Sequence, residues 1–181
     1  MSNDPTRTRL EVLEARDRLN QAADEALELA LRDRLSLGPT LRSLLPLLAS
    51  HANAHQVWVR TFDEDLQLRD FRYGGELPFD CDAIHQATER GDRLQRHLGD
   101  ATLVAQPLDV AGELFGAAGV IIEAHASPER VAVVAGLLDV WCEELDNYLA
   151  SIARARHKER IGRALGEALE EPVLEEGVNR A

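Results

Sequence analysis

The feature that most constrains the fold is a long amphipathic stretch in the C-terminal third of the chain. Ser127 and Pro128 are typical of a helix start, because serine caps the first turn and proline fits the first helical position. The next proline is Pro172, so one helix is predicted between them. A helix of roughly 40 residues is about 60 Å long at ~1.5 Å per residue, more than a compact domain needs to cover a sheet. Its apolar residues keep alternating spacings of three and four: Val131, Val134, Leu138, Trp141, Leu145, Tyr148, Ile152 and Ala155.

The second half of this predicted helix differs from the first. After Ile152 the apolar stripe narrows, and residues 154–163 are mainly basic. We interpret the basic residues as a solvated face rather than a nucleic-acid or lipid site, because glutamates follow at once. Glu159 and Gly162 interrupt the apolar seam, and Ile161 resumes it in another phase. Such a phase change alters supercoiling locally and can act as a two-state element. Because the apolar stripe narrows after Ile152 and charged residues follow, we expect this segment to leave the domain.

A second long helix is predicted from Thr6 to Leu35, where Ala, Leu, Glu and Arg predominate and neither glycine nor proline occurs. Its seam is rich in alanine, which lets another helix approach closely. Two interpretations remain open: the seam packs on its own domain, or it pairs with a partner helix from another chain, which we favour. The seam consists of Val12, Ala15, Leu19, Ala22, Ala26 and Leu29.

Between the long helices the apolar period changes to two, which is typical of strands. A bulge is expected near Arg69 and Asp70, because the apolar parity shifts between Leu68 and Phe71. The expected elements are a helix over 40–52 with Pro46 inside it, strands over 57–62 and 66–73, a short helix over 81–90, a weak strand over 93–98, and strands over 101–110 and 114–124.

Three stretches of this middle region resemble one known family. Residues 61–68 (TFDEDLQL) form a hairpin motif, and Gly74-Gly75 stands where its second strand would end. Residues 103–108 (LVAQPL) combine an apolar strand with Pro-Leu, and residues 112–120 (GELFGAAGV) combine a turn with a glycine-containing strand. With the order helix, hairpin, short helix, hairpin and long helix, these motifs resemble a GAF domain, a sensor fold related to PAS. The resemblance covers about residues 37 to 149.

The resemblance implies an α+β fold, with a central antiparallel β-sheet, helices on one face and a ligand pocket on the other. It also implies that the long N- and C-terminal helices pair into a parallel dimeric bundle that carries a signal to an output domain. We therefore divide the chain into an N-terminal dimerisation helix (1–35), a GAF-like sensor domain (36–150) and a C-terminal signalling helix or linker (151–181).

The charge and cysteine content of the chain limit the classes of partner that we expect it to bind. The formal net charge of −12 disfavours nucleic acid, whose phosphates need cationic side chains, and anionic membranes. Cys81 and Cys142 form neither a disulfide framework nor a metal-knuckle pattern, which fits reduced thiols in a cytosol. The N-terminal residues lack the apolar core of a signal peptide. A cytoplasmic location is the resulting expectation, with neither nucleic acid nor membrane as partner.

No motif in the sequence identifies a ligand. The Asn-Lys…Phe…Asp-Glu pattern of cyclic-nucleotide-binding GAF domains is absent from the sequence. Cys81 lacks the flanking His and aromatic residues of bilin attachment sites, so no covalent bilin is expected. His51 and His55 have a metal-compatible spacing, but no third ligand is near in the sequence, so no metal is expected. By analogy of fold and strand parity, the residues expected to line a small-molecule pocket are Trp58, Phe71, Tyr73, His85, His97 and Gln106.

These observations predict a regulatory sensor and dimerisation module of a signalling protein, not an enzyme. Its expected partners are a second copy of the chain, a small-molecule ligand and a C-terminal effector of the cyclase, histidine kinase or transcriptional activator type. Two alternatives remain: a free-standing thiol enzyme of the methionine sulfoxide reductase type using Cys81, and a ligand-free dimerisation scaffold. In the dimer, Leu145→Asp is expected to separate the subunits. The residues expected at the dimer interface are Val12, Leu19, Ala26, Val134, Leu138, Trp141, Leu145, Tyr148 and Ile152.

Overall fold

The structure is a computed structural model and describes residues 5–110 and 113–170. The order of its helices and strands agrees with the sequence prediction, and the ends differ by a few residues. The elements are α1 (Pro5–Arg32), α2 (Leu37–Ala52), β1 (Gln56–Phe62), β2 (Leu68–Tyr73), α3 (Cys81–Thr88), β3 (Leu94–His97), β4 (Ala101–Val110), β5 (Glu113–Glu123) and α4 (Pro128–Glu170).

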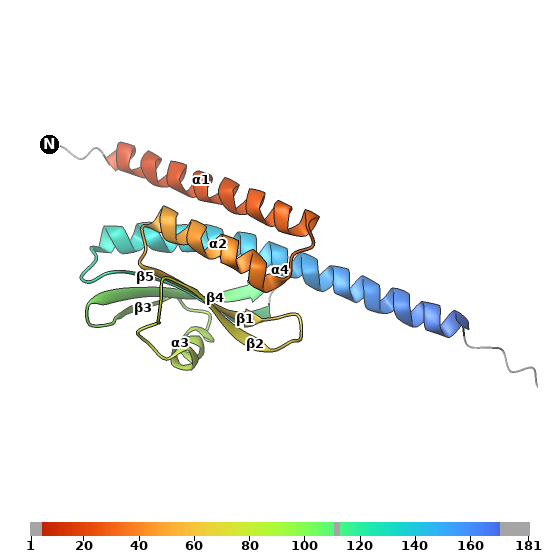
Figure 1. Cartoon of the computed structure of the whole chain (residues 1–181). Coiled ribbons are helices and arrows are strands. Elements are labelled where there is room, and N and C mark those ends of the chain that lie inside the picture. The colour runs from red at the N-terminus through yellow and green to blue at the C-terminus, as the bar shows by residue number, and fades with distance from the viewer. Residues whose placement is uncertain (1–4, 111–112, 171–181) are drawn as a thin grey trace, which may run out of the picture.

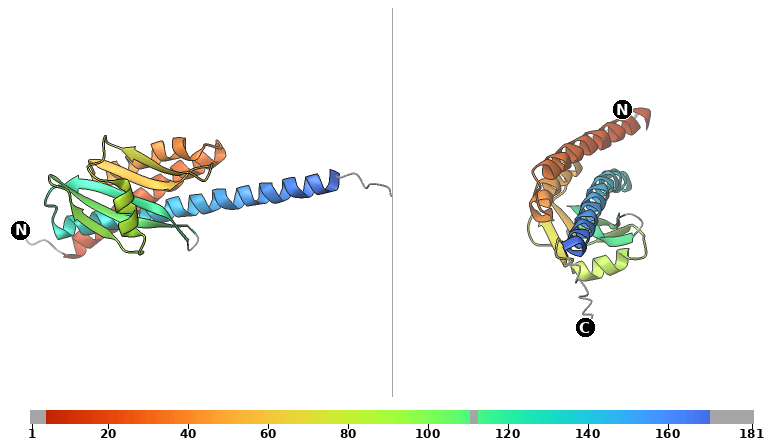
Figure 2. Two further views of the ribbon diagram at one scale, coloured as in Figure 1. Left: turned by 90° about the horizontal axis from the view of Figure 1, so that it is seen from below. Right: turned by 90° about the vertical axis from the view of Figure 1, so that its right-hand side faces the viewer.

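The strands form one antiparallel sheet in the order β2-β1-β5-β4-β3. Helices α2 and α4 cover one face of this sheet, and α1 lies over them as an outer layer (Figures 1 and 2). Helix α3 lies on the opposite face. The expected α+β fold with an antiparallel sheet is confirmed, and the two faces of the sheet are called the helix face and the α3 face below.

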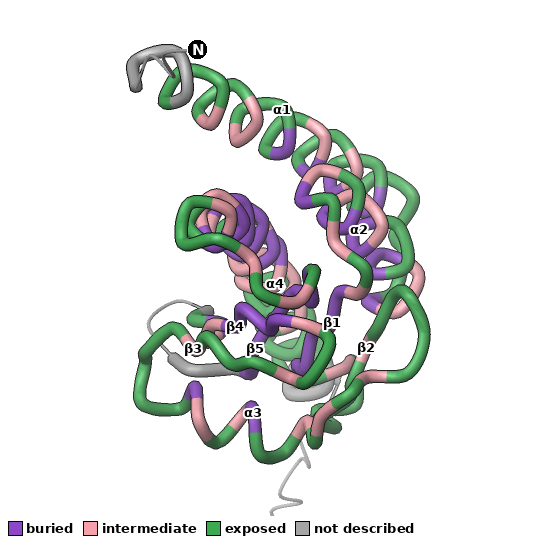
Figure 3. Tube along the Cα trace, turned by 90° about the vertical axis from the view of Figure 1, so that its left-hand side faces the viewer, coloured by how far each residue is buried: buried purple, intermediate pink, exposed green. Residues whose placement is uncertain are grey.

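The main core lies between the helix face and the three long helices (Figure 3). Two aromatic side chains of α4 anchor it by hydrogen bonds to α2. The indole Nε1 of Trp141 donates to the carbonyl oxygen of Leu44 over 3.2 Å. The hydroxyl of Tyr148 lies 3.1 Å from Oγ1 of Thr40. Because both aromatic residues are buried, these bonds fix how α4 packs against α2.

Helix α1 packs on its own chain rather than standing free. Its buried residues Leu19, Ala23, Leu27 and Ala30 belong to the main core, and its contacts are with α2 and α4. The predicted seam is slightly rotated, since Leu29 is 45% exposed. Of the predicted seam, Leu19 is thus buried within its own chain, which corrects our preference for a partner helix at this residue. Pairing through the half-buried and exposed residues of the seam stays a prediction.

The same correction applies to most of the predicted dimer interface. Val134, Leu138 and Leu145 have no exposed surface within a single chain, and Trp141 and Tyr148 are at most 3% exposed. Leu19 is also buried, whereas Val12, Ala26 and Ile152 are half-buried. The buried side chains among them are already covered by other elements of their own chain. A spacing of three and four predicts that a helix face is buried, but it does not identify the chain that covers it.

The hairpin of β1 and β2 also differs from the prediction. Its register runs without interruption from Phe62 opposite Leu68 to Val57 opposite Tyr73, so the bulge expected near Arg69 and Asp70 is absent from this pair. Leu66 lies in the turn with a φ of 58°, and the strand begins only at Leu68. Within β2, Leu68 and Phe71 point to opposite faces of the sheet, and Leu68 is 37% exposed. The apolar parity shifts because β2 has apolar residues on both faces, not because of a bulge. A register shift does occur between β4 and β5, at Leu108 and Asp109.

Helix α4 continues well past the sheet (Figure 2). From residue 153 to 166 its side chains are exposed, with the exception of Arg156. A Cβ added at Gly162 or Gly166 would meet no atom within 4 Å. The expectation that this segment leaves the domain agrees with the described part of α4. The predicted end at Pro172 and the linker residues 171–181 lie outside the described residues.

One carboxyl group on α4 predicts a pH dependence of stability. Burial, together with the charges of Asp109 and Glu143, raises the pKa of Asp146 to about 7, although a backbone hydrogen bond from Asp109 opposes this. Its Oδ1 is buried without a hydrogen-bond partner. The folded state therefore holds a proton between about pH 4 and pH 7 that the unfolded chain releases, so stability falls as the pH rises through this range.

Asp146→Asn is expected to remove this dependence. Between pH 5 and pH 8 the wild-type free energy of unfolding should fall by about 1–2 kcal/mol relative to the variant, a value reduced because the carboxyl is partly solvated. Urea unfolding of both proteins at the two pH values measures the difference. Equal changes in both proteins would contradict a raised pKa at Asp146.

Candidate functional site

The α3 face carries its own small core, which α3 covers. Trp58 of β1 and Ile84 of α3 have no exposed surface and pack together with residues of β4 and β5. The ring of Phe79 meets the Trp58 ring edge-on, with centroids 5.4 Å apart and an interplanar angle of 81°. In this structure, side chains occupy the position beneath α3 where the GAF resemblance led us to expect a ligand.

A polar network at the edge of this core holds α3 to the sheet. The guanidinium of Arg60 donates from Nε and Nη2 to the two carboxylate oxygens of Asp70, each over 3.0 Å. The indole of Trp58 donates to the same carboxylate over 2.8 Å. From Nη1, Arg60 donates to Asp82 in the first turn of α3. We call Arg60, Asp70 and Asp82 the latch, because they connect β1, β2 and α3.

The latch keeps its charges although it is partly buried. The Arg60 side chain is only 11% exposed, whereas Asp82 is 72% exposed. Burial alone would lower the pKa of Arg60, but its hydrogen bonds to Asp82 and Asp70 raise it above the ordinary value. Arginine suits this position, since its planar fork matches a carboxylate in two places at once. The exposed end of the latch, Asp82, is therefore the part that can open at least cost.

The two cysteines do not favour thiolate chemistry. Burial and the charge of Asp70 raise the pKa of Cys81 to about 11. Burial also raises the pKa of Cys142, so both thiols are protonated at neutral pH. The sheet separates them, because Cys81 packs on the α3 face and Cys142 lies in the main core. Nothing in this geometry supports Cys81 as a nucleophile with Cys142 as its resolving partner.

The six residues expected to line one pocket lie on two faces of the sheet. Trp58 is on the α3 face, and His85 is on α3 itself. Phe71 packs against the main core on the helix face. Tyr73 follows two residues later in β2, so its side chain points to the same face. The structure does not bring them into one lining, because successive side chains in a strand point to opposite faces and these residues have different parities.

The remaining two predicted residues also lie away from Trp58. Gln106 of β4 accepts a hydrogen bond from Arg93 over 3.2 Å and lies beside Cys142 of α4. His97 lies 3.4 Å from the hydroxyl of Thr102, its cross-strand partner, and its ring is 6.4 Å from that of His125. Both are on the helix face, so they do not meet the core under α3.

A second set of contacts joins the tip of the β1–β2 hairpin to two helices. The carboxylate of Asp63 accepts from the backbone N–H groups of Asp65 and Gln67, each over 2.9 Å, and these bonds shape the turn. The bond from Gln67, together with those from Arg69 and Asp65, lowers the pKa of Asp63, although burial opposes this effect. The carboxylate of Glu64 accepts from the backbone N–H of Leu37 at the start of α2, where the helix dipole favours a negative charge.

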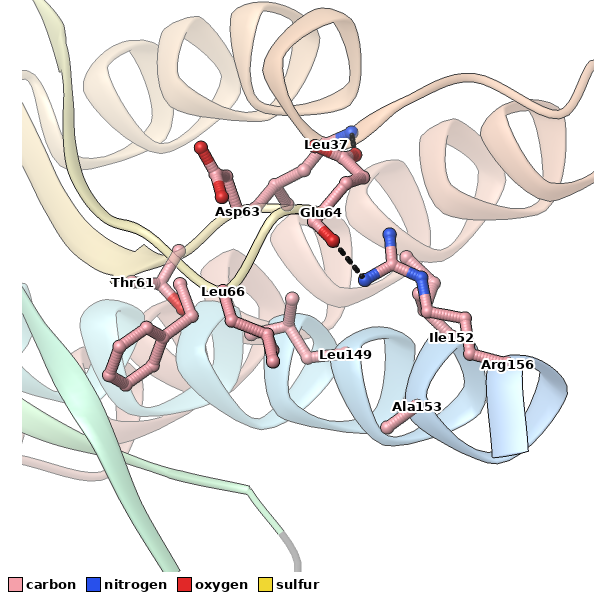
Figure 4. Close-up of a pocket in the computed structure, with 10 residues that line it drawn as sticks. Leu37, Thr61, Asp63, Glu64, Leu66, Leu149, Ile152, Ala153 and Arg156 are labelled. Atoms are coloured by element: carbon pink, nitrogen blue, oxygen red, sulfur yellow. Dashed lines mark hydrogen bonds between the residues drawn. The ribbon is translucent and has the colours of Figure 1, made fainter. Parts of the chain in front are cut away.

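The hairpin tip also reaches the exit of α4. Arg156 donates from Nη1 to the carbonyl oxygen of Glu64 over 3.3 Å (Figure 4). The tip therefore contacts both the first turn of α2 and the point where α4 leaves the domain. Sequence reasoning placed a turn at residues 63–65 but missed these contacts, because they join segments distant in the chain.

The described part of the chain offers few other sites. Nδ1 of His51 lies 2.9 Å from the carbonyl oxygen of Leu47, and among described residues no three His, Cys, Asp or Glu side chains are grouped so that they could hold a metal ion. Within the same residues, none of the helices is both long enough and apolar enough to cross a membrane.

Sequence comparison identifies no relative: no protein-family model matches the chain, and no curated protein matches it. Solved structures are similar in fold. The Nlh2 GAF domain of A. aeolicus in an inactive state has a TM-score of 0.54 and 13% identity, covering 80% of this chain and 99% of its own. The GAF domain of a putative sensor histidine kinase from Pseudomonas syringae pv. tomato has a TM-score of 0.55 and 13% identity, covering 82% and 98%.

A third similar structure is the GAF domain of an Acinetobacter phosphoenolpyruvate-protein phosphotransferase. Its TM-score is 0.53 at 12% identity, and the match covers 85% of this chain and 97% of that domain. In each case nearly the whole length of the solved domain is matched. Together with the five-stranded antiparallel sheet and the helices on its two faces, these similarities show that the chain has the fold of a GAF domain.

Proposed function

We propose that this chain is a regulatory sensor module that passes a change at its α3 face to α4 and from there to an effector domain. The observation that carries the proposal is the position of β1 between the two candidate sites. Arg60 in β1 belongs to the latch under α3, and only a few residues later Glu64 contacts the start of α2 and the exit of α4. A displacement of α3 is therefore coupled to α4 through one short strand.

The proposed assembly is a parallel homodimer with an effector after α4. The predicted interface residues are largely used inside one chain, so we assign the contact between copies to exposed apolar side chains. These are Leu10, Leu13 and Leu31 of α1, and Ile161 and Leu165 of α4, which are between 47% and 59% exposed. An effector of the cyclase, histidine kinase or transcriptional activator type fits a helix that projects from its domain.

A ligand-free scaffold is the second candidate function. It is favoured by one observation, the filling of the position under α3 by Trp58 and Phe79. The two candidates differ in what the latch does. In a sensor, opening the latch changes the exit of α4, whereas in a scaffold it loosens only α3.

Asp82→Asn tests the proposal, because it removes the charge that holds α3 to Arg60. Amide hydrogen exchange in α3 is expected to become about two- to fivefold faster, corresponding to a loss of about 0.4–1 kcal/mol for a largely exposed ion pair. If β1 transmits the change, exchange should also rise in residues 63–67 and 149–156. Asp92→Asn is the matched control, since Asp92 is exposed and its side chain has no described partner.

Two results would count against the proposal. Faster exchange in α3 with unchanged exchange in residues 63–67 and 149–156 would favour the scaffold. The same increase in the Asp92→Asn control would show that the effect comes from the loss of an acidic charge rather than from the latch.

A further inference from the structure

A half-open cavity of about 90 Å³ lies between the hairpin tip and the exit of α4 (Figure 4). Its walls are mainly apolar and come from three elements: Leu37 begins α2, Phe62 and Leu66 flank the turn, and Leu149 and Ile152 belong to α4. The cavity lies on the helix face, beside α4. It is thus distinct from the position under α3, and its occupation does not depend on the proposed function.

The floor of the cavity contains an unsatisfied polar group. Thr61 lines the cavity and is only 1% exposed, and its Oγ1 has no hydrogen-bond partner. Thr61 has the parity of Val57 and Val59, which face the helices, so its side chain points toward α4. A buried hydroxyl without a partner costs free energy that a suitable ligand would recover.

The charges at the rim are balanced. Asp63 is paired with Arg69 over 2.9 Å, and the backbone of Glu64 accepts from Arg156. The Glu64 carboxylate accepts from the backbone N–H of Leu37. The formal charges of the two carboxylates and the two guanidinium groups cancel, which favours neither an anion nor a cation. A neutral ligand fits this environment best, because it gives up the least hydration on binding.

We propose that this cavity binds a small, neutral, mostly apolar molecule that carries one hydroxyl group. The apolar part enters between Leu66, Leu149 and Ile152, and the hydroxyl group exchanges a hydrogen bond with Oγ1 of Thr61. The volume is smaller than the ~150 Å³ that holds benzene in an engineered cavity, so a ring enters through the open side only in part.

Phenol and toluene are the probes, because they match in size and differ in the hydroxyl group. In amide NMR titrations, phenol is expected to shift residues 61–66 and 149–156 and to bind about tenfold more tightly than toluene, the effect of about 1.4 kcal/mol for one hydrogen bond. Thr61→Val keeps the shape of the side chain and should reduce the affinity for phenol to that for toluene. Because it removes an unpartnered polar group, the variant is expected to fold at least as stably as wild type.

A second pair of variants tests the place of binding without touching the core. Ala153 lines the cavity mouth, and Ala155 does not, although both are exposed on α4. Ala153→Leu should weaken phenol binding at least fivefold, and Ala155→Leu should leave it unchanged. Equal binding of phenol and toluene to wild type, undiminished phenol binding by Thr61→Val, or absence of shifts around Thr61 would each overturn the proposal.

Discussion

Leu145→Asp is expected to unfold the chain rather than only separate two subunits. Leu145 has no exposed surface and lies in the main core between α4 and its neighbours. Replacing a buried leucine with a small residue costs about 2–5 kcal/mol, and burying an unpaired carboxylate costs several more. The sum approaches the whole stability of a typical domain, about 5–15 kcal/mol. Far-UV circular dichroism at 25 °C should show loss of most helical signal.

Leu165→Asp is the matched control on the same helix. Leu165 is 59% exposed, so this variant should keep the wild-type spectrum and unfolding midpoint. If copies pair through the projecting part of α4, light scattering should show twice the chain mass for wild type and a smaller mass for Leu165→Asp. A folded, monomeric Leu145→Asp variant would contradict the burial of Leu145 within one chain and return it to the dimer interface.

The local elements of the fold could be predicted because each has a periodic signal. The change from a period of two to spacings of three and four marks the boundary between β5 and α4, and Ser127-Pro128 marks the start of the helix. The seam through Trp141 and Leu145 predicted burial correctly. It could not show that α1 and α2 of the same chain cover it, because the covering partner of a helix depends on tertiary contacts.

The candidate site was predicted less well, since its members come from segments that only the fold brings together. Trp58 was identified, but Arg60, Asp70 and Asp82 were not. A signal for the latch did exist. A lone arginine in the apolar strand of residues 57–62 needs a partner when buried, and Asp70 lies directly opposite it in the register of β1 and β2. The assumed bulge changed that register and hid the pair.

The contacts of the hairpin tip had no comparable signal. Turn chemistry predicts that Asp63 binds nearby backbone N–H groups, and this bond is present. Nothing local indicates that Glu64 meets the first turn of α2 or that Arg156 meets the tip. The contact of Glu64 depends on where α2 begins relative to the sheet, and that of Arg156 on the direction in which α4 leaves it. Both are properties of the whole domain.

Gly116→Ala is the second substitution with a large expected effect, because it forces two strands apart. A Cβ at Gly116 would lie 1.8 Å from the carbonyl oxygen of Arg60 and 2.8 Å from its carbonyl carbon. Both are backbone atoms of β1, so no side-chain rotation relieves the clash. We expect a loss of about 3 kcal/mol or more in the free energy of unfolding, at the upper end for overpacking. Urea unfolding followed by tryptophan fluorescence measures it.

Gly162→Ala makes the same chemical change where there is space. No atom lies within 4 Å of a Cβ at Gly162 on the exposed part of α4, so this variant should gain about 0.5–1 kcal/mol of helix stability locally. The contrast separates steric conflict from the general effect of replacing glycine. Because the Gly116→Ala clash displaces Arg60, hydrogen exchange in α3 should also rise as the latch to Asp82 is strained. An unfolding midpoint equal to wild type would mean that β1 and β5 are not as close at Gly116 as the register requires, and the path from α3 through β1 to α4 would then lose its structural basis.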